Sequence, residues 1–322
     1  MVATPYTLSL YLMYMPEEAL EKTFFCVYNQ LKDDIISQLP HVQTFYEFEE
    51  ANNKQYWRFR LIAAIKYFFI RFTDIYAMDF LNFVPQLIGH CKYTCLEDGT
   101  GSFSFAPHDA VLKPWQLPYS LWGLKRRIQH GPVYGRAMGN NKQCVNRLIT
   151  SPGDIESPFI KGRNYTLVDF NNAWNNASQK KKDSILKIFN LSNAQIEKAT
   201  CCKTIVLTQP LVFVGITEVE VIDIYAPYIK QYQDNGVLIK PHPAENIDYS
   251  RYFPNVMVWR TKAPMQLLTA MGAHFDRAIT VFSTAVGTLP ADTEIIWLGT
   301  EVHPKLYKEV GHIGLDEVIG KR

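Results

Sequence analysis

The regular alternation of short apolar runs with helix-like segments in the second half is the feature that most constrains this chain's fold. A continuous apolar run such as Thr204-Ile205-Val206-Leu207 is typical of a strand buried on both faces of a parallel sheet. Helix-like segments follow at 218–231 and 265–271. Strand and helix in alternation predict a parallel α/β architecture. The remaining strands are expected at 237–239, 256–259, 278–282 and 295–298.

The first half alternates less clearly. The acidic residues after Pro16 predict the start of a helix, and the later part of 45–72 also has helical character. The stretch 106–139 is rich in Pro, Gly and Trp, so we expect it to be irregular. Strands are expected at 7–14, 75–83 and 93–96.

Length and composition favour two globular domains. The chain has 322 residues, of which 47% are hydrophobic and 20% charged, enough to bury a substantial core. The polar segment 171–199 separates the two alternating halves, and we place the inter-domain passage there. We therefore predict two Rossmann-like domains facing across a cleft, at 1–175 and 176–322. The last residues of the chain can pack back on the N-terminal domain in this arrangement.

Charge and cysteine usage narrow the class of partner and the location. A net charge of +2 gives no reason to expect nucleic acid or another polyanion as the main ligand. None of the six cysteines forms a Cys-x-x-Cys pair, and the first apolar run, 8–15, lacks the flanks of a secretory leader. We expect reduced thiols and a cytoplasmic protein, with the inner face of the cytoplasmic membrane as an alternative location.

The basic, aromatic segment 58–72 is too interrupted by charge to be a membrane span, which needs about 20 apolar residues. One interpretation is an amphipathic helix with its apolar side in the core. The other is contact with an anionic membrane surface, which would make the protein peripherally associated. We favour the first, since amphipathic helices are the norm in globular proteins.

Three short polar signatures each follow an apolar run. They are Glu97-Asp98-Gly99, Lys240-Pro241-His242-Pro243 and Ser283-Thr284. In doubly wound sheets, ligands bind beyond the carboxyl ends of the strands, so we link the three into one site. Thr208 and Gln209 close the strand from Thr204 and are expected to line the same cleft, although a simple turn is the alternative.

His242 is the best candidate for a phosphate contact. Pro241 and Pro243 restrict the backbone around it, so the imidazole projects from a stiff strand end. An unperturbed histidine has a pKa of about 6.5 and can therefore be a cation beside a phosphate. Lys240 adds positive charge. The alternative is an ordinary loop histidine.

The other two signatures of the predicted site provide hydroxyl and carboxylate groups. Ser283 and Thr284 lie where a strand gives way to a helix, a position that suits either a phosphate or a simple N-cap. In Glu97-Asp98-Gly99-Thr100-Gly101, adjacent side chains point to opposite sides. One carboxylate can then enter the cleft and act as general base, while the other is hydrogen-bonded elsewhere. A polar turn is the alternative.

Several signatures are missing from the sequence. It has no Asp-x-Asp, no P-loop, no Gly-x-Gly-x-x-Gly and no Gly-x-Ser-x-Gly. No His/Cys/Asp cluster has convincing metal-ligand spacing. We therefore expect a mechanism that needs neither a metal nor another cofactor.

In the order of these motifs the chain resembles the bacterial sialyltransferases of glycosyltransferase family 52, which are similar to polysialyltransferases and to Pasteurella- and Photobacterium-type enzymes. The resemblance implies a GT-B fold, CMP-sialic acid as donor and a metal-independent, inverting displacement. It implies that Asp98 deprotonates the acceptor hydroxyl, and that His242 binds the CMP phosphate and can protonate it as it leaves. Ser283 and Thr284 would hold phosphate oxygens. The N-terminal domain would then face the acceptor and the C-terminal domain would bind the CMP-sugar.

One departure from the pattern is Pro264-Met265-Gln266, where related enzymes carry Pro-x-Glu beside the cytidine ribose. Gln266 can still hydrogen-bond a ribose hydroxyl, without charge. The expected acceptor is a terminal galactose of a bacterial surface polysaccharide or lipooligosaccharide. Two alternatives stay open: a transferase of Kdo or another CMP-ulosonic acid, and a nucleotide- or glycan-binding protein without catalysis.

Overall fold

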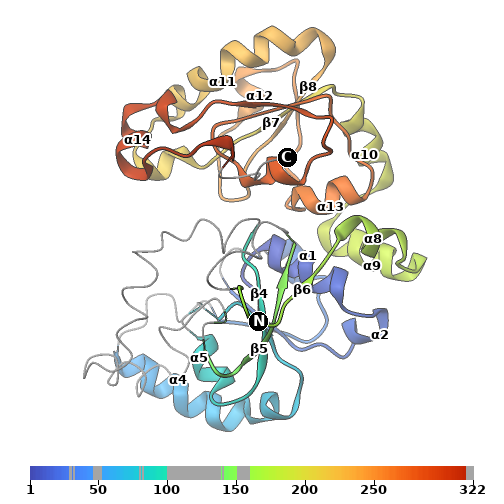
Figure 1. Cartoon of the computed structure of the whole chain (residues 1–322), viewed down its shortest axis with the longest axis vertical. Coiled ribbons are helices and arrows are strands. Elements are labelled where there is room, and N and C mark those ends of the chain that lie inside the picture. The colour runs from blue at the N-terminus through green and yellow to red at the C-terminus, as the bar shows by residue number, and fades with distance from the viewer. Residues whose placement is uncertain are drawn as a thin grey trace. The chain divides into compact units, whose positions relative to one another are not determined.

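The computed structural model describes residues 1–28, 31, 33–45, 53–79, 81, 83–99, 139, 141–150 and 160–316. The chain divides into two compact units, Met1–Asp169 and Phe170–Arg322 (Figure 1). This boundary lies before α8 (Phe170–Asn175), whereas the predicted first domain, 1–175, includes that helix. The helix belongs to the second unit because it packs against α13 (Met265–Ala270).

The second unit is built on one parallel sheet. Its strands run in the order β11-β10-β7-β8-β9, and every neighbouring pair is parallel. From the β9 edge, the strands follow the chain order third, second, first, fourth, fifth, so the direction of winding reverses between β7 and β10. This is the doubly wound order of Rossmann folds. The strands are β7 (Thr204–Leu207), β8 (Val237–Lys240), β9 (Met257–Val258), β10 (Arg277–Thr280) and β11 (Glu294–Trp297).

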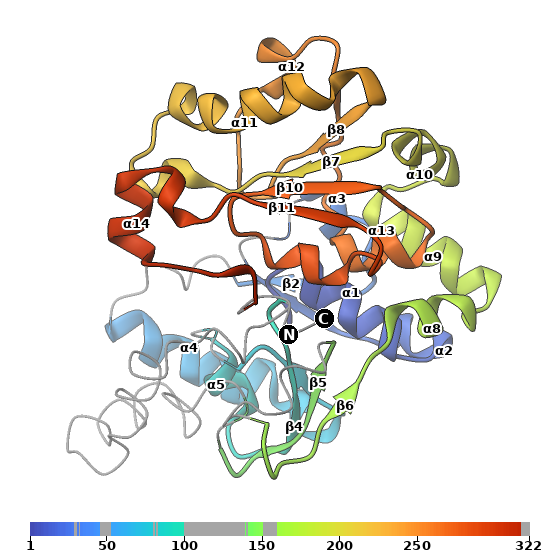
Figure 2. The same cartoon turned by 45° about the horizontal axis from the view of Figure 1, so that its top comes forward.

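Helices cover both faces of this sheet. Figure 2 shows α11 and α12 on one face and α13 on the other. The core on the first face joins Val206, Ile239 and Ile279 of the strands to Val221 and Tyr225 of α11, all fully buried. The further helices are α9 (Gln179–Phe189), α10 (Asn193–Thr200), α11 (Glu218–Tyr232), α12 (Tyr249–Tyr252), α14 (Pro304–Val310) and the 3₁₀ helices η4 (Leu211–Val214), η5 (Gln233–Asn235), η6 (Thr284–Thr288) and η7 (Thr300–Val302).

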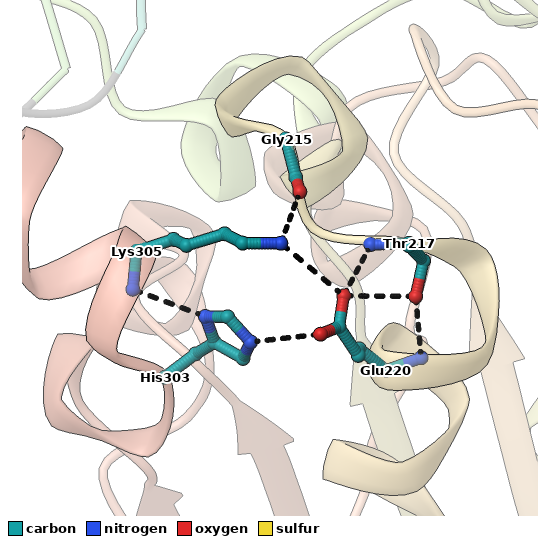
Figure 3. Close-up of polar contacts among 5 residues, drawn as sticks. All are labelled: Gly215, Thr217, Glu220, His303 and Lys305. Atoms are coloured by element: carbon teal, nitrogen blue, oxygen red, sulfur yellow. Dashed lines mark hydrogen bonds and ion pairs between the residues drawn. The ribbon is translucent and has the colours of Figure 1, made fainter.

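A polar network fixes α14 against the start of α11 (Figure 3). Thr217 caps α11, and the Glu220 carboxylate accepts the Thr217 N–H at 2.7 Å, which completes a capping box. His303 and Lys305 reach the same carboxylate, with N···O distances of 3.5 and 3.8 Å. Lys305 also donates to the Gly215 carbonyl at 2.8 Å. One carboxylate thus serves two helices that are far apart in the sequence.

The first unit also contains parallel strands. β3 (Tyr76–Ala77), β4 (Tyr93–Leu96), β5 (Cys144–Ile149) and β6 (Thr166–Leu167) form one sheet in that order, and β1 (Phe25–Val27) pairs with β2 (Val42–Thr44). Met1 and Val2 form hydrogen bonds with both of these sheets. Val2 N–H donates to the Cys26 carbonyl at 3.0 Å, and the Met1 ammonium donates to the Tyr76 carbonyl at 2.7 Å. Both units therefore have parallel α/β architecture, as predicted.

The strand expected at 7–14 is wrong, because this segment is helical. α1 (Pro5–Tyr14) starts with the Thr4 side chain accepting the Thr7 N–H and with proline in its first turn. Leu8 and Leu10 are fully buried, as are most of their neighbours, so the helix shows no amphipathic period. The other helices of this unit are α2 (Glu17–Leu20), α3 (Asp33–Ile36), α4 (Asn53–Lys66), η2 (Phe68–Phe72) and α5 (Val84–Ile88).

The strand expected at 75–83 is also shorter than predicted, since among the described residues of this segment only Tyr76–Ala77 belongs to a strand. Asp79 follows, and its buried carboxylate accepts hydrogen bonds from the Tyr93 hydroxyl and from the Gly139 N–H. The predicted irregular stretch 106–139 lies, apart from Gly139, outside the described residues, as do the last residues, 317–322. None of the described helices combines the length and apolarity that spanning a bilayer requires.

Candidate functional site

The predicted signatures of the second unit lie at one edge of its sheet. Thr208 follows β7, His242 follows β8 after one residue, and Ser283 follows β10 after two. These are the carboxyl ends of parallel strands, as the sequence predicted. The winding reverses between β7 and β10, which is where doubly wound sheets bind ligands. The structure also joins two of the motifs directly, since the His242 N–H donates to the Thr208 hydroxyl at 3.3 Å.

The imidazole of His242 has a defined tautomer. Its Nδ1 accepts a hydrogen bond from the Ala244 N–H at 3.1 Å. In a neutral imidazole the other nitrogen then carries the proton, so Nε2–H is a hydrogen-bond donor. Burial, and to a smaller extent the charge of Lys240, lower the pKa of His242 to about 4. The ring is therefore neutral at pH 7 in this environment, whereas an unperturbed side chain would be partly cationic.

Lys240 is the charged group of this edge. It ends β8 and only 7% of it is exposed. Burial lowers the pKa of its ammonium group to about 8, so most of it still carries a charge at pH 7. No carboxylate among the described residues lies within ion-pair distance of it. A buried cation beside a neutral imidazole donor favours an anion at this place.

A buried network that the sequence did not reveal supports the histidine turn. The Glu245 carboxylate accepts hydrogen bonds from the Thr208 hydroxyl and, at 2.9 Å, from the Tyr249 hydroxyl. The Glu245 N–H donates to the His242 carbonyl at 2.9 Å, closing the turn. Burial raises the pKa of Glu245, and these hydrogen bonds oppose the shift. The signal that could have indicated this network is an acidic residue two positions after Pro243.

The hydroxyl pair lies at the start of a short 3₁₀ helix. Ser283 caps η6, with its side chain accepting the Ala285 N–H at 3.4 Å. Its own N–H donates to the Thr280 hydroxyl at 3.1 Å, and that hydroxyl donates to the Leu207 carbonyl at 2.8 Å. This chain of bonds ties the end of β10 to the end of β7. Ser283 and Thr284 are both half-buried.

The remaining predicted contacts differ in accessibility. Thr208, Gln209 and Gln266 are buried, at 3%, 9% and 7% exposure, whereas Pro243 is half-buried. The Thr208 hydroxyl is engaged by Glu245 and by the His242 backbone, so it positions the histidine turn. Gln266 is the second residue of α13, in the connection between β9 and β10.

In the first unit, Asp98 follows β4 in a turn at which Gly99 has a φ of 122°. A positive φ of this kind suits glycine, which has no Cβ. The Thr4 hydroxyl donates to Asp98 Oδ1 at 3.2 Å. Burial raises the pKa of Asp98 to about 6, and the bond from Thr4 partly opposes this shift. A carboxylate with such a pKa is suited to accept a proton near neutral pH.

Glu97 has a different environment from its neighbour. It is fully buried, and its carboxylate accepts hydrogen bonds from the Thr150 N–H at 2.7 Å and from the Tyr6 hydroxyl at 3.1 Å. The two adjacent carboxylates thus have different hydrogen-bond partners, and those of Glu97 are Tyr6 and Thr150. Glu97 anchors the turn that presents Asp98. Thr100 and Gly101 lie outside the described residues.

A cavity of about 390 Å³ in the first unit lies away from Asp98. Met1, Phe25 and Tyr76 line it, together with Phe69. Phe25 and Tyr76 are the first residues of β1 and β3, so the cavity is at the amino ends of these strands. Among the residues that the structure describes, no three His, Cys, Asp or Glu side chains are grouped as metal ligands.

Two parallel α/β units with polar turns at the carboxyl ends of their strands define a protein of the GT-B fold class. A 2,6-sialyltransferase of Photobacterium sp. JT-ISH-224, solved with CMP and lactose, has a TM-score of 0.59 to this chain. The identity is 12%, over 92% of this chain and 69% of that one. The GT-B domain of the Photobacterium damselae sialyltransferase has a TM-score of 0.53 at 13% identity, over 90% and 86% of the two chains.

The chain belongs to glycosyltransferase family 52, whose model matches residues 9–306. The protein is therefore a glycosyltransferase. An uncharacterized protein of Haemophilus influenzae strain Rd is 27% identical over 242 residues, which make up 75% of this chain and 73% of that protein.

Proposed function

We propose that this protein is a sialyltransferase that transfers sialic acid from CMP-sialic acid to a hydroxyl group of a glycan. Membership in family 52 and the GT-B relatives support this function. The observation that carries it is the anion-favouring edge of the second unit, where the His242 Nε2–H and the buried Lys240 ammonium follow β8. A structural relative was solved with CMP and lactose, which supports CMP as the anion proposed here.

The reaction exchanges one bond to the anomeric carbon for another. The acceptor oxygen attacks that carbon and gives its proton to the Asp98 carboxylate. The bond between the carbon and the phosphate oxygen breaks, and its electron pair leaves with CMP. Because attack and departure occur on opposite faces, the configuration inverts. CMP gains one negative charge in this step. Hydrogen-bond donors that bind the phosphate more strongly in the transition state than in the ground state therefore accelerate the reaction.

His242 acts in this proposal first as a neutral hydrogen-bond donor. Its Nε2–H binds a phosphate oxygen, while the Ala244 N–H holds Nδ1 as acceptor. A nearby phosphate raises a histidine pKa, because the opposite charge stabilises the imidazolium. The ring can then pass its proton to the departing phosphate. Lys240 stabilises the added charge, with Ser283 and Thr284 as further phosphate contacts.

The acceptor is proposed to be a terminal galactose of a bacterial surface polysaccharide or lipooligosaccharide, modified in the cytoplasm. No metal or other cofactor is required. A transferase of Kdo or another CMP-linked ulosonic acid is a second candidate of the same class, because the proposed contacts to CMP do not distinguish the two donors. Gln266 is proposed to lie beside the ribose that both donors share. An amide at the ribose position provides hydrogen bonds without charge, so it alters donor binding relative to a carboxylate.

Donor selectivity tests this function. Thermal shifts measured with CMP, UDP and GDP should show stabilisation by CMP alone, because ligands that bind only the native state raise its melting temperature. CMP release should then be followed with CMP-sialic acid and CMP-Kdo on a panel of galactosides, with and without EDTA. Turnover with CMP-sialic acid that resists EDTA supports the proposal. Turnover with CMP-Kdo alone would move the assignment to the second candidate, and stabilisation by UDP or GDP instead of CMP would contradict both.

A further inference from the structure

The helical segment formed by α4 and η2 is apolar on two sides. Ala63, Tyr67 and Ile70 are buried at the spacing of one helix face. The opposite side carries five exposed apolar side chains, at i, i+4, i+7 and i+11 spacing and beside it. We call this surface the α4–η2 face, and it consists of Leu61, Ile62, Ile65, Phe68 and Phe72. The interpretation of 58–72 as a helix with one apolar side in the core is therefore incomplete.

The degree of exposure on this face is unusual for side chains of this size. Leu61, Ile65 and Phe72 are 64%, 71% and 77% exposed. Single exposed apolar residues are common, but a contiguous group marks an interaction site in a folded protein. Figure 1 shows α4 beside α5 in the first unit, and the two helices are in contact. The buried stripe thus faces the unit while the α4–η2 face is directed away from it.

The charges around the face are of one sign. The segment 53–73 contains five Lys or Arg residues and no Asp or Glu. Of these, Arg58, Lys66 and Arg71 are exposed. The Arg71 guanidinium lies 5.0 Å from the Phe68 ring centre, so cation and aromatic group form one surface. An apolar stripe flanked by cations is the pattern of a helix that lies in a membrane interface.

Two occupants could cover such a face, an anionic bilayer or a second copy of the chain. In a two-fold dimer built on this face, the cations of 53–73 would lie against the same segment of the other copy, which has no acid to pair with them. Such opposition of like charges is costly. An anionic membrane surface instead attracts every cation and accepts the apolar side chains. The charge pattern favours the membrane.

We propose that the α4–η2 face binds the surface of an anionic membrane, with its apolar side chains inserted at the level of the headgroups. Lys66 and Arg71 contact the anionic headgroups. Loss of one such cation is expected to weaken binding about fivefold, the effect of about one basic residue near an anionic surface. This inference concerns how the protein attaches to a membrane, and it holds whichever donor sugar the enzyme uses.

Co-sedimentation with vesicles tests this inference. The full chain is mixed with vesicles of phosphatidylcholine, or of phosphatidylcholine and phosphatidylglycerol in equal parts, at low and high salt. We expect binding to the anionic vesicles that weakens with salt, and little binding to the neutral ones. The double variant Ile65→Gln/Phe72→Ser should bind at least about tenfold more weakly, since it removes two inserted side chains. Lys66→Gln/Arg71→Gln should lose binding to anionic vesicles selectively.

Phe213→Ser is the matched control, because Phe213 is 72% exposed but lies in the second unit. It should bind vesicles like the wild-type protein. All the substituted side chains are exposed, so melting temperatures and turnover with soluble substrates should stay unchanged. The inference is overturned if the wild-type protein does not bind anionic vesicles, or if the double variant binds as well as Phe213→Ser. It is also overturned if the face instead holds a dimer, seen as dissociation of the double variant without lipid.

Discussion

The backbone N–H of Ala244 donates to Nδ1 of His242 at 3.1 Å, which leaves Nε2–H as the free donor of the imidazole. The relationship arises within one short turn, because Ala244 lies two residues after His242. It determines which nitrogen of the neutral ring accepts a hydrogen bond and which one donates. The proposed phosphate contact depends on that arrangement.

Substitution of His242 tests this arrangement. His242→Ala removes the donor and should weaken CMP binding and turnover together, each by about 10- to 100-fold, the range for a hydrogen bond to a charged group. His242→Gln places an amide N–H near the position of Nε2 and should recover part of the CMP affinity. Isothermal titration with CMP measures both. Equal CMP affinity in wild-type and His242→Ala proteins would remove His242 from the phosphate site.

Asp98→Asn should separate turnover from donor binding. The amide cannot accept the acceptor's proton, so the turnover number is expected to fall about 10²- to 10⁴-fold, the usual contribution of a general base. CMP affinity should remain within error, because Asp98 belongs to the first unit and the proposed phosphate site to the second. Steady-state kinetics together with CMP titration test this. The assignment fails if CMP affinity falls while the turnover number is preserved.

The pH profile should carry the pKa of Asp98. Burial raises this pKa to about 6, and only the deprotonated form can act as base. The turnover rate should therefore be full above about pH 7 and fall as the pH drops through about 6. The Thr4 hydroxyl lowers the Asp98 pKa, so Thr4→Val should move the acid limb to higher pH.

Thr4→Ser keeps the hydroxyl and serves as the control for this shift. Thr4 also caps α1, so Thr4→Val should cost about 1 kcal/mol of stability, as lost N-caps do. A profile measured well below the melting temperature isolates the effect on the pKa. If the acid limb of the pH profile is unchanged in Thr4→Val, the titration of Asp98 is not its cause.

Glu245 is expected to position His242 without touching substrate. Glu245→Gln replaces a carboxylate that accepts two hydroxyl donors, from Thr208 and Tyr249, by an amide that can leave one of them unpaired. CMP affinity should fall severalfold and the melting temperature should drop. Tyr249→Phe removes one donor and leaves the Thr208 bond, so it should lower stability with a smaller effect on CMP affinity. A larger loss of CMP affinity in Tyr249→Phe than in Glu245→Gln would contradict a positioning role for Glu245.

Glu220 provides a test of the fold that is independent of the site. Hydrogen bonds from the backbone and side chain of Thr217 lower the pKa of this carboxyl from 4.5 to about 2. A depressed pKa contributes stability that is present above the unfolded value and is lost as pH falls through the folded one. Glu220→Gln should therefore lower the melting temperature at pH 7, and the difference should shrink between about pH 5 and pH 2. A pH-independent difference would show that charge does not matter here.

The central strands of the second unit, β7, β8 and β10, could be predicted from sequence because nearly all of their residues are buried. Thr204–Leu207 is an uninterrupted apolar run with no competing interpretation. The segment of α1 suggests a strand because Leu8, Leu10 and Leu12 alternate with other residues, as strand positions do. The deciding signals were local, namely the Thr4 cap and the following proline. A helix buried all round has no amphipathic period to reveal it.

The site motifs could be placed at strand ends, but their partners could not be found from the sequence. Thr4 is 94 positions from Asp98, and Thr150 is 53 from Glu97. The contact between Glu97 and Thr150 arises because the parallel strands β4 and β5 bring their carboxyl ends to one edge, and the contact between Thr4 and Asp98 arises because α1 packs against β4. The low pKa of His242 likewise depends on burial, which no local pattern indicates. The residue types thus indicated which side chains could act at the site, whereas their hydrogen-bond partners and pKa shifts depend on the fold.

The most direct test of the central claim is the product mixture formed from CMP-sialic acid and lactose, followed by proton NMR. The wild-type protein should produce CMP and sialyl-lactose in equal amounts, with the anomeric configuration inverted, in the presence of EDTA. Asp98→Asn should bind CMP but form neither product at a comparable rate. Absence of sialyl-lactose and of any other sialoside, or equal turnover by Asp98→Asn, would contradict the proposed function.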